Sequence, residues 1–302
     1  MKRSDRFQLP LLAILCAVLW GSAFPVIKHV YSGWESNSLE LRLCFAGIRF
    51  ALAGLLIVPF CFSSFARNQG EWKRFLFLLA FTQTFLQYIF FYSGLAVSSG
   101  VLGSILVGSG SLWWILLTPI LLKTPPPTRR HLLVIFMSMI GVVLAVYAPG
   151  IGSGSPLTGT LFFLAASLSG AVGSIVIVPL AKLMDVRLAT SGALFIGGLA
   201  LFLCGIRALP QFWAELDAAM LISTCYLAGV SAGAFGIWNW LIREHSVNVL
   251  AGYRFLIPLS AVTQSTLFIE GESPGLGIFL GGGLILGALY YLQRFEASIR
   301  SR

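Results

Sequence analysis

Two arginines in the middle of long apolar stretches are the residues of this sequence that are best suited to do chemistry. Arg49 and Arg254 each lie about 12 to 15 Å from one end of such a stretch, at a helical rise of 1.5 Å per residue. An arginine at that depth in a bilayer costs roughly 2.5 to 3.5 kcal/mol unless it faces protein or water. Its guanidinium fork can bind a carboxylate or a phosphate. The alternative is a structural role, in which each arginine binds backbone carbonyls or a helix end.

Polar side chains from other stretches could complete a binding site. On a helix over residues 75–96, Gln83 and Gln87 share one face, and Tyr88 and Tyr92 share the adjoining face. The amides can hydrogen-bond a ligand, or they can join helices at about 0.6 kcal/mol each. We expect further substrate contacts from three residues elsewhere in the chain, Trp20, Asn239 and Tyr253.

The acidic residues are placed differently from the arginines. All 11 aspartates and glutamates lie in loops, tails or the edges of apolar stretches. A positive charge at mid-depth without an acidic partner favours an anionic or zwitterionic substrate over a cationic one. It also argues against proton antiport through a buried carboxylate.

The sequence lacks the residue patterns of a membrane enzyme. The three histidines lie at the edges of apolar stretches, and no paired aspartates or His-Glu-x-x-His motif occurs. The five cysteines fall inside apolar stretches without metal-like spacing, which is typical of packing. We therefore expect no catalytic residue, metal site or cofactor.

The composition predicts the elements that must hold these side chains. Hydrophobic residues make up 57% of the chain and charged residues 10%, and the mean hydropathy is +0.89. Soluble domains carry roughly 25% charged residues. A bilayer core requires about 20 apolar residues per helix. We therefore expect an all-α polytopic membrane protein with ten transmembrane helices, over residues 9–29, 39–62, 75–96, 100–122, 132–149, 157–180, 188–206, 218–241, 246–269 and 274–293.

The basic residues predict an orientation in the membrane. With both termini cytoplasmic, 15 of the 20 lysines and arginines fall in cytoplasmic segments, as cytoplasmic loops require. The net charge of +9 is then a topological signal, and we expect no nucleic-acid partner. The predicted location is the cell (inner) membrane, with a retained first span in place of a cleaved signal peptide.

Weak internal similarity divides the chain into two halves. A flexible Gly- and Ser-rich linker over residues 149–156 separates residues 1–149 from residues 150–302, and similar patterns recur at an offset close to 148 residues. Each half holds five predicted spans. An odd repeat must be inserted upside down relative to its partner, so we expect two inverted repeats and a binding site near the middle of the bilayer.

Several motifs resemble the EamA family of ten-span transporters in the drug/metabolite transporter superfamily. Residues 20–24 (Trp-Gly-Ser-Ala-Phe) with Lys28, and residues 49–53 (Arg-Phe-Ala-Leu-Ala), are similar to the first- and second-span patterns of the family. Residues 255–259 (Phe-Leu-Ile-Pro-Leu) resemble the end of the second repeat. The first half departs from the family at Lys123, where a glycine followed by an acidic residue is usual. The resemblance implies helices around a central cavity and the export of amino acids or other metabolites.

These observations predict an integral membrane transporter that moves a small polar metabolite by alternating access. Pro258, one turn after Arg254, is the expected hinge. The alternatives are a flippase or transporter of a lipid-linked or nucleotide-like metabolite and, less favoured, a membrane enzyme. The expected partners are the small-molecule substrate and the lipid bilayer, with the chain as a monomer or homodimer.

Overall fold

A computed structural model of the chain describes residues 5–35, 38–61, 70–99, 102–103, 106–107, 110–147, 156–245, 250, 253–254, 256–268 and 275–300. Within these ranges every regular element is a helix, as the composition predicts. Backbone N–H and C=O groups in lipid must be paired inside their own segment, and a helix achieves this.

The helices are long and are connected by short segments. The α-helices are α1 (Asp5–Ser32), α2 (Leu39–Ile57), α3 (Trp72–Leu79), α4 (Gln87–Val97), α6 (Gly110–Leu122), α7 (Arg129–Tyr147), α8 (Pro156–Leu180), α9 (Val186–Cys204), α10 (Leu209–Ala214), α11 (Ala218–Glu244), α13 (Leu256–Phe268) and α14 (Leu276–Arg300). Short 3-10 segments follow α2 at Val58–Phe60 (η1) and α9 at Ile206–Ala208 (η4). Side chains cap three of the described helix starts. Ser38 accepts from the N–H of Leu41 at 3.1 Å, Asp185 from that of Arg187 at 2.8 Å, and Asp217 from that of Met220 at 2.7 Å.

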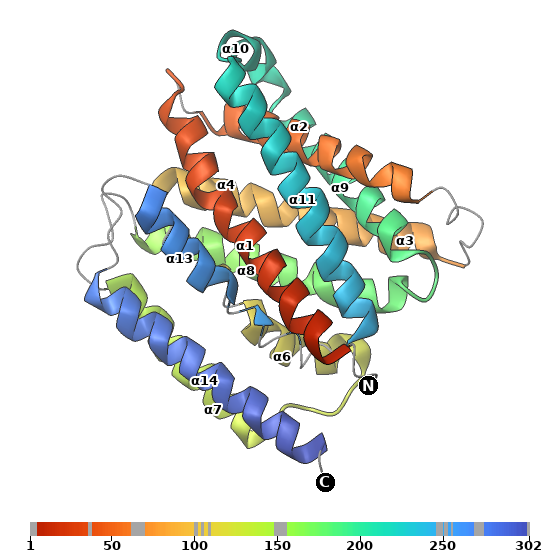
Figure 1. The fold of residues 1–302 in the computed structure, drawn as a ribbon, viewed down its shortest axis with the longest axis vertical. Coiled ribbons are helices and arrows are strands. Elements are labelled where there is room, and N and C mark those ends of the chain that lie inside the picture. Colours follow the sequence, from red (N-terminus) through yellow and green to blue (C-terminus); the bar gives the residue numbers. More distant parts are fainter. Residues whose placement is uncertain are drawn as a thin grey trace.

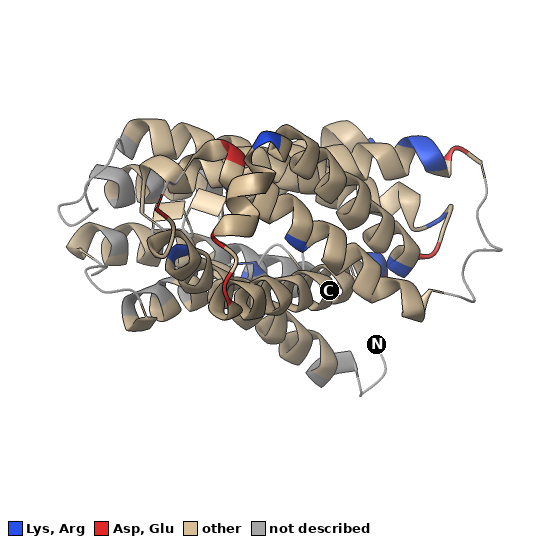
Figure 2. Ribbon diagram, turned by 90° about the horizontal axis from the view of Figure 1, so that it is seen from above, with Lys and Arg blue, Asp and Glu red and all other residues tan. Residues whose placement is uncertain are grey.

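Six of these helical segments are long and apolar enough to cross a bilayer. They cover Gln8–Ser32, Leu39–Phe60, Trp72–Val97, Leu157–Leu180, Val186–Cys204 and Ala218–Glu244. Shorter apolar helices cover Gly110–Leu122, Leu132–Gly141 and Phe279–Ala288. Most of the described ribbon carries neither acidic nor basic residues (Figure 2). The part of the chain that the structure describes is therefore all-helical, and its spans are those of a multi-pass membrane protein.

Helices from the two halves of the chain lie against one another (Figure 1). α2 packs on α9, α1 on α11 and α13, α4 on α8, and α7 on α14, so each of these pairs joins one helix from either side of residue 150. Figure 1 shows α7 and α14 side by side at the edge of the bundle. The buried core lies among the remaining helices, where Trp20 of α1 contacts both hydrophobic clusters.

The contact between α2 and α9 depends on glycine. A Cβ atom at Gly198 would lie 2.5 Å from the backbone N of Ala51, and one at Gly54 would lie 2.7 Å from that of Phe195. Ser191 donates from its hydroxyl to the carbonyl of Gly54 at 2.8 Å. Small residues let membrane helices approach this closely, so the two backbones are in direct contact.

The span over Trp72–Val97 contains an irregular turn that the sequence did not predict. Between α3 and α4 the chain forms a π-helical segment, η3, at Ala80–Leu86. Helix α9 packs against it, and a Cβ atom at Gly197 would lie 2.8 Å from the carbonyl of Ala80. π-Helical turns often mark functional sites, and this one carries Gln83.

Candidate functional site

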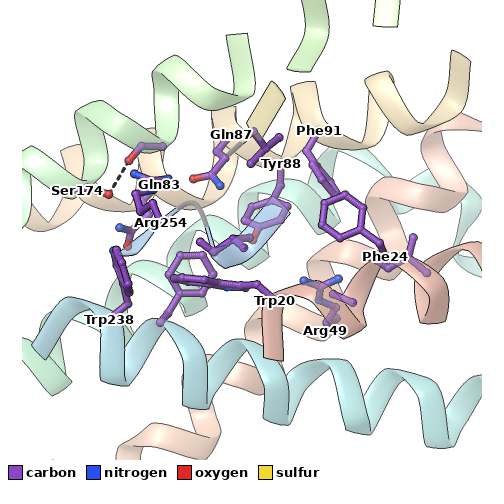
Figure 3. Close-up of a pocket in the computed structure, with 16 residues that line it drawn as sticks. Trp20, Phe24, Arg49, Gln83, Gln87, Tyr88, Phe91, Ser174, Trp238 and Arg254 are labelled. Atoms are coloured by element: carbon purple, nitrogen blue, oxygen red, sulfur yellow. Dashed lines mark hydrogen bonds between the residues drawn. The ribbon is translucent and has the colours of Figure 1, made fainter. Parts of the chain in front are cut away.

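A cavity lies inside the bundle, between α1, α2, η3 and α4 from the first half and α8, α11 and the start of α13 from the second. Its volume is about 70 Å³, which is small for a ligand pocket. The lining residues are Trp20, Ala23, Phe24, Ile27, Arg49, Gln83, Gln87, Tyr88, Phe91, Val107, Gly170, Ser174, Phe235, Trp238, Arg254 and Ile257. Figure 3 shows how ten of them surround the space.

Arg49 enters the cavity from α2 and is held entirely by neutral groups. Its side chain is 2% exposed, and its Nη1 donates to the hydroxyl of Tyr92 at 2.7 Å. Its Nη2 donates to the hydroxyl of Ser231 at 3.2 Å, and the guanidinium carbon lies 4.4 Å from the ring centre of Phe50. The Nε atom is buried without a hydrogen-bond partner. A donor of a charged group is therefore left free in the bundle.

Arg254 lies just before α13 and also lacks a carboxylate partner among the described residues. It is 8% exposed, and its guanidinium carbon lies 4.8 Å from the ring centre of Trp114 in a cation–π contact. Trp114 is itself fixed, because its Nε1 donates to the carbonyl of Ala171 at 3.2 Å. Nη1 of Arg254 is buried without a partner, and so is the hydroxyl of Ser167. A Cβ atom at Gly110 would lie 3.2 Å from Nη2 of the arginine and 3.3 Å from that hydroxyl.

Gln83 and Gln87 occupy the wall between η3 and α8. Gln83 exchanges two hydrogen bonds with Asn239 of α11, at 3.3 and 3.2 Å, and Asn239 also donates to the hydroxyl of Thr190 at 3.0 Å. Gln87 lies over Gly170, where a Cβ atom would come within 2.5 Å of its Oε1. The amide of Asn239 therefore joins three helical segments, η3, α9 and α11, whereas no such pairing holds Gln87 among the described residues.

Aromatic rings form most of the remaining wall. Trp20 makes edge-to-face contacts with Phe235 at 5.3 Å and with Trp238 at 5.5 Å between ring centres. Tyr88 contacts Phe91 at 5.7 Å in the same way. Edge-to-face pairs contribute about 0.5 to 1.5 kcal/mol beyond their burial, so the wall is rigid and apolar.

The cavity brings together six of the nine predicted substrate-binding residues: Trp20, Arg49, Gln83, Gln87, Tyr88 and Arg254. Two others lie directly behind it, Tyr92 on Arg49 and Asn239 on Gln83. Tyr253 packs, partly buried, against the hydrophobic cluster that contains Trp114. Pro258 is buried in the first turn of α13, next to the lining residue Ile257.

Sequence reasoning missed several lining residues. Gly170 and Ser174 lie four residues apart on α8 and line the cavity, although neither is among the predicted substrate contacts. Trp238, which is also absent from the predicted contacts, is 2% exposed and lines the cavity. The small-residue spacing was a usable signal for α8, because a stripe that admits a helix can also border an open space.

Two buried arginines border a cavity inside an apolar helical bundle, and their free donors are suited to a ligand that accepts hydrogen bonds. Residues 9–147 match the model of the EamA-like transporter family, so the resemblance indicated by the sequence motifs is confirmed. Over these residues, which make up somewhat less than half of its length, the chain is similar to EamA-like transporters. It is 26% identical to an uncharacterized transporter of Synechocystis sp., over all of this chain and 94% of that protein.

Other similar proteins agree with this class. A probable amino-acid metabolite efflux pump of Salmonella typhimurium is 25% identical over 99% of this chain and 98% of its own length. A protein of known crystal structure is 16% identical to this chain with a TM-score of 0.68, over 93% of this chain and 96% of its own. That structure shares the fold.

Proposed function

We propose that this transporter exports or exchanges a small anionic or zwitterionic metabolite, and that the substrate binds in the cavity between Arg49 and Arg254. The observation that carries the proposal is the free guanidinium nitrogen of each arginine, Nε of Arg49 and Nη1 of Arg254. Buried polar groups in proteins are nearly always paired, and a charged donor left unpaired is costly. A bound anion supplies the missing acceptors, and hydrogen bonds between two charged groups are the stronger kind.

Alternating access requires two halves that can move against each other, and the helix neighbours support an inverted repeat. We assign five pairs of equivalent helices, one from each half: α1 with α8, α2 with α9, the α3–η3–α4 span with α11, α6 with α13, and α7 with α14. The contact of α1 with α13 then corresponds to that of α8 with α6, and the contact of α1 with α11 to that of α8 with α4. The α2–α9 contact and the α7–α14 contact each join two equivalent helices, so an exchange of the two halves leaves them unchanged. This pattern is expected of two related five-helix repeats, residues 1–149 and 150–302, in a ten-span protein.

The cavity is bordered by residues of both repeats, which is where inverted-repeat transporters bind their substrates. Rocking of one repeat against the other would open the cavity to each side in turn, with Pro258 as a hinge beside Arg254. An amino-acid metabolite, as named for the Salmonella relative, is one member of the proposed substrate class.

The proposal is tested by uptake into proteoliposomes that contain the purified protein. A panel of carboxylates, amino acids and cationic drugs is offered as labelled compounds. We expect transport of one or more carboxylates and none of the cations. Arg49→Gln and Arg254→Gln are expected to reduce that transport at least tenfold, whereas Arg207→Gln, at an exposed position in η4, leaves it unchanged. Absence of transport for every carboxylate by folded protein, or transport of cations only, would contradict the proposal.

A further inference from the structure

We infer that the cavity selects an organic dianion, in which two anionic groups are joined by a flat apolar body, over a zwitterion or a monoanion. This inference rests on the proposed function and specifies its substrate class. It starts from the presence of two separate cationic groups in one cavity, each with a free hydrogen-bond donor, and from the apolar wall between them.

The two arginines provide two binding positions, because different elements hold them. Arg49 is anchored on α2 by Tyr92 and Ser231, and Arg254 contacts Trp114 of α6. Figure 3 shows the two side chains at different ends of the cavity, with Trp20 between them. A single carboxylate at one end therefore leaves the free nitrogen at the other end without an acceptor.

Charge balance separates a dianion from a zwitterion. The described lining residues include two arginines and no aspartate or glutamate. A zwitterion would bring its ammonium group into a cavity that already holds two positive charges, where no carboxylate can pair with it. Cation–π contacts with Trp20 or Trp238 would offset only part of that repulsion. Two carboxylates neutralise both arginines, and each occupies one free donor.

The Arg254 end is built to hold an anion with two acceptor oxygens. The unpaired hydroxyl of Ser167 and Nη2 of Arg254 both lie close to Gly110, 3.3 and 3.2 Å from where its Cβ atom would be, so two donors are neighbours at this end. A carboxylate can accept one hydrogen bond on each oxygen there. Between the two ends, the rings of Trp20, Tyr88 and Phe235 line the cavity, and an aromatic substrate body can pack against them edge to face or offset.

A matched set of ligands with one ring tests the inference. The set is benzoate, phenylalanine and terephthalate, which carry one carboxylate, one carboxylate with an ammonium, and two carboxylates. Adipate, with two carboxylates on a flexible chain, tests the flat body. Binding to purified protein in detergent is measured by tryptophan fluorescence, since Trp20 and Trp238 line the cavity. We expect terephthalate to bind at least tenfold tighter than benzoate and phenylalanine, and adipate to fall between them.

Variants show which end binds which group. Arg254→Gln is expected to remove the preference for terephthalate while benzoate affinity changes less than threefold, and Arg254→Lys is expected to retain part of the preference. Gly110→Ala, which places a methyl group close to the hydroxyl of Ser167, should also lower terephthalate affinity. Arg207→Gln is the control and should not alter either ligand.

The wild-type ratios decide the inference even if a variant fails to fold. Binding of benzoate or phenylalanine as tight as that of terephthalate and adipate would overturn the dianion preference and leave the proposed transport of carboxylates intact. A lack of binding by any of the four, together with no carboxylate transport in the proteoliposome panel, would instead remove the proposed function itself.

Discussion

At the scale of single residues, the neutral partners of the arginines are the most informative feature. Carboxylates in proteins commonly neutralise buried guanidinium groups, but Arg49 is held by the hydroxyls of Tyr92 and Ser231 and by aromatic rings. Hydroxyl groups orient a guanidinium without cancelling its charge. The positive charge therefore remains available to a ligand.

Removal of the hydroxyl of Tyr92 tests this orienting role. Tyr92→Phe deletes the 2.7 Å acceptor of Arg49 while the ring is kept. Because a hydrogen bond to a charged group contributes about 1.5 to 3 kcal/mol, we expect substrate affinity to fall roughly tenfold or more. The measurement is the dissociation constant of the best carboxylate from the panel. Tyr226→Phe, at a position more exposed to the surroundings, is the matched control. Equal affinities for the two variants would contradict the orienting role.

The Gln83–Asn239 pair makes a second prediction at this scale. Asn239 is fully buried and bonded to Gln83 and Thr190, so Asn239→Leu leaves the Gln83 amide without its partner. We expect a loss of stability of about 1 to 3 kcal/mol, measured as a lower midpoint of thermal unfolding in detergent.

The double variant Gln83→Leu with Asn239→Leu completes that test. Coupling between polar groups in membrane proteins averages about 0.6 kcal/mol and reaches about 1.7 kcal/mol. If the two effects add without any coupling, Asn239 acts independently of Gln83, and its predicted role as a substrate ligand gains weight over the role as a support.

The residue types of the site could be predicted from the sequence, but not all of their roles. Arg49 and Arg254 were found because a charge in an apolar stretch is costly wherever it lies, so its presence needs a reason. Asn239 and Gln87 carry the same kind of side chain, yet one is tied to its neighbours and the other borders the cavity. That difference depends on distances between helices, which no residue pattern contains.

At the scale of elements, the long spans follow from apolar length, whereas their irregularities do not. The six spans agree with the predicted stretches because a run of about 20 apolar residues matches the thickness of the bilayer core. The π-helical segment η3 has no such signature. It lies where α9 approaches the backbone at Gly197, so it depends on a neighbour far away in the chain.

The glycines between α2 and α9 make a prediction at this scale. In Gly198→Ala, the new methyl group would lie 2.5 Å from the backbone N of Ala51, which no side-chain movement can relieve. We expect the midpoint of unfolding to fall by several degrees, and transport to fall with it. Gly229→Ala on α11 is the matched control, because nothing lies within 4 Å of its new Cβ atom.

That control variant should be neutral or slightly stabilising, since alanine is favoured over glycine in a helix by about 0.8 to 1.0 kcal/mol. An equal effect of the two substitutions would mean that the α2–α9 contact tolerates separation.

At the scale of the whole molecule, orientation in the membrane is the property that contacts alone do not define. The basic residues predict that the loop after α8, which contains Lys182, faces the cytoplasm and that η4, which contains Arg207, faces outward. Helix α9 lies between these two positions, so they should be on opposite sides.

Single cysteines introduced at these two sites test the orientation. In a background without the native cysteines, Arg207→Cys should react with an impermeant maleimide added to intact cells. Lys182→Cys should react with the maleimide only after the membrane is permeabilised. The reverse pattern would place both termini outside, and labelling of both positions from one side would contradict the assignment of α9 as a membrane span.

The uncompensated charges of Arg49 and Arg254 have a consequence for the energy source of the proposed transport. Moving one charge through a membrane potential of 100 mV involves about 2.3 kcal/mol, and a substrate with two charges involves about twice that amount. In a cell with a negative interior, an anion that neutralises these arginines and leaves the cell moves toward the positive side, which lowers its electrical energy. The voltage across the membrane can therefore drive export on its own, with no ion carried in exchange.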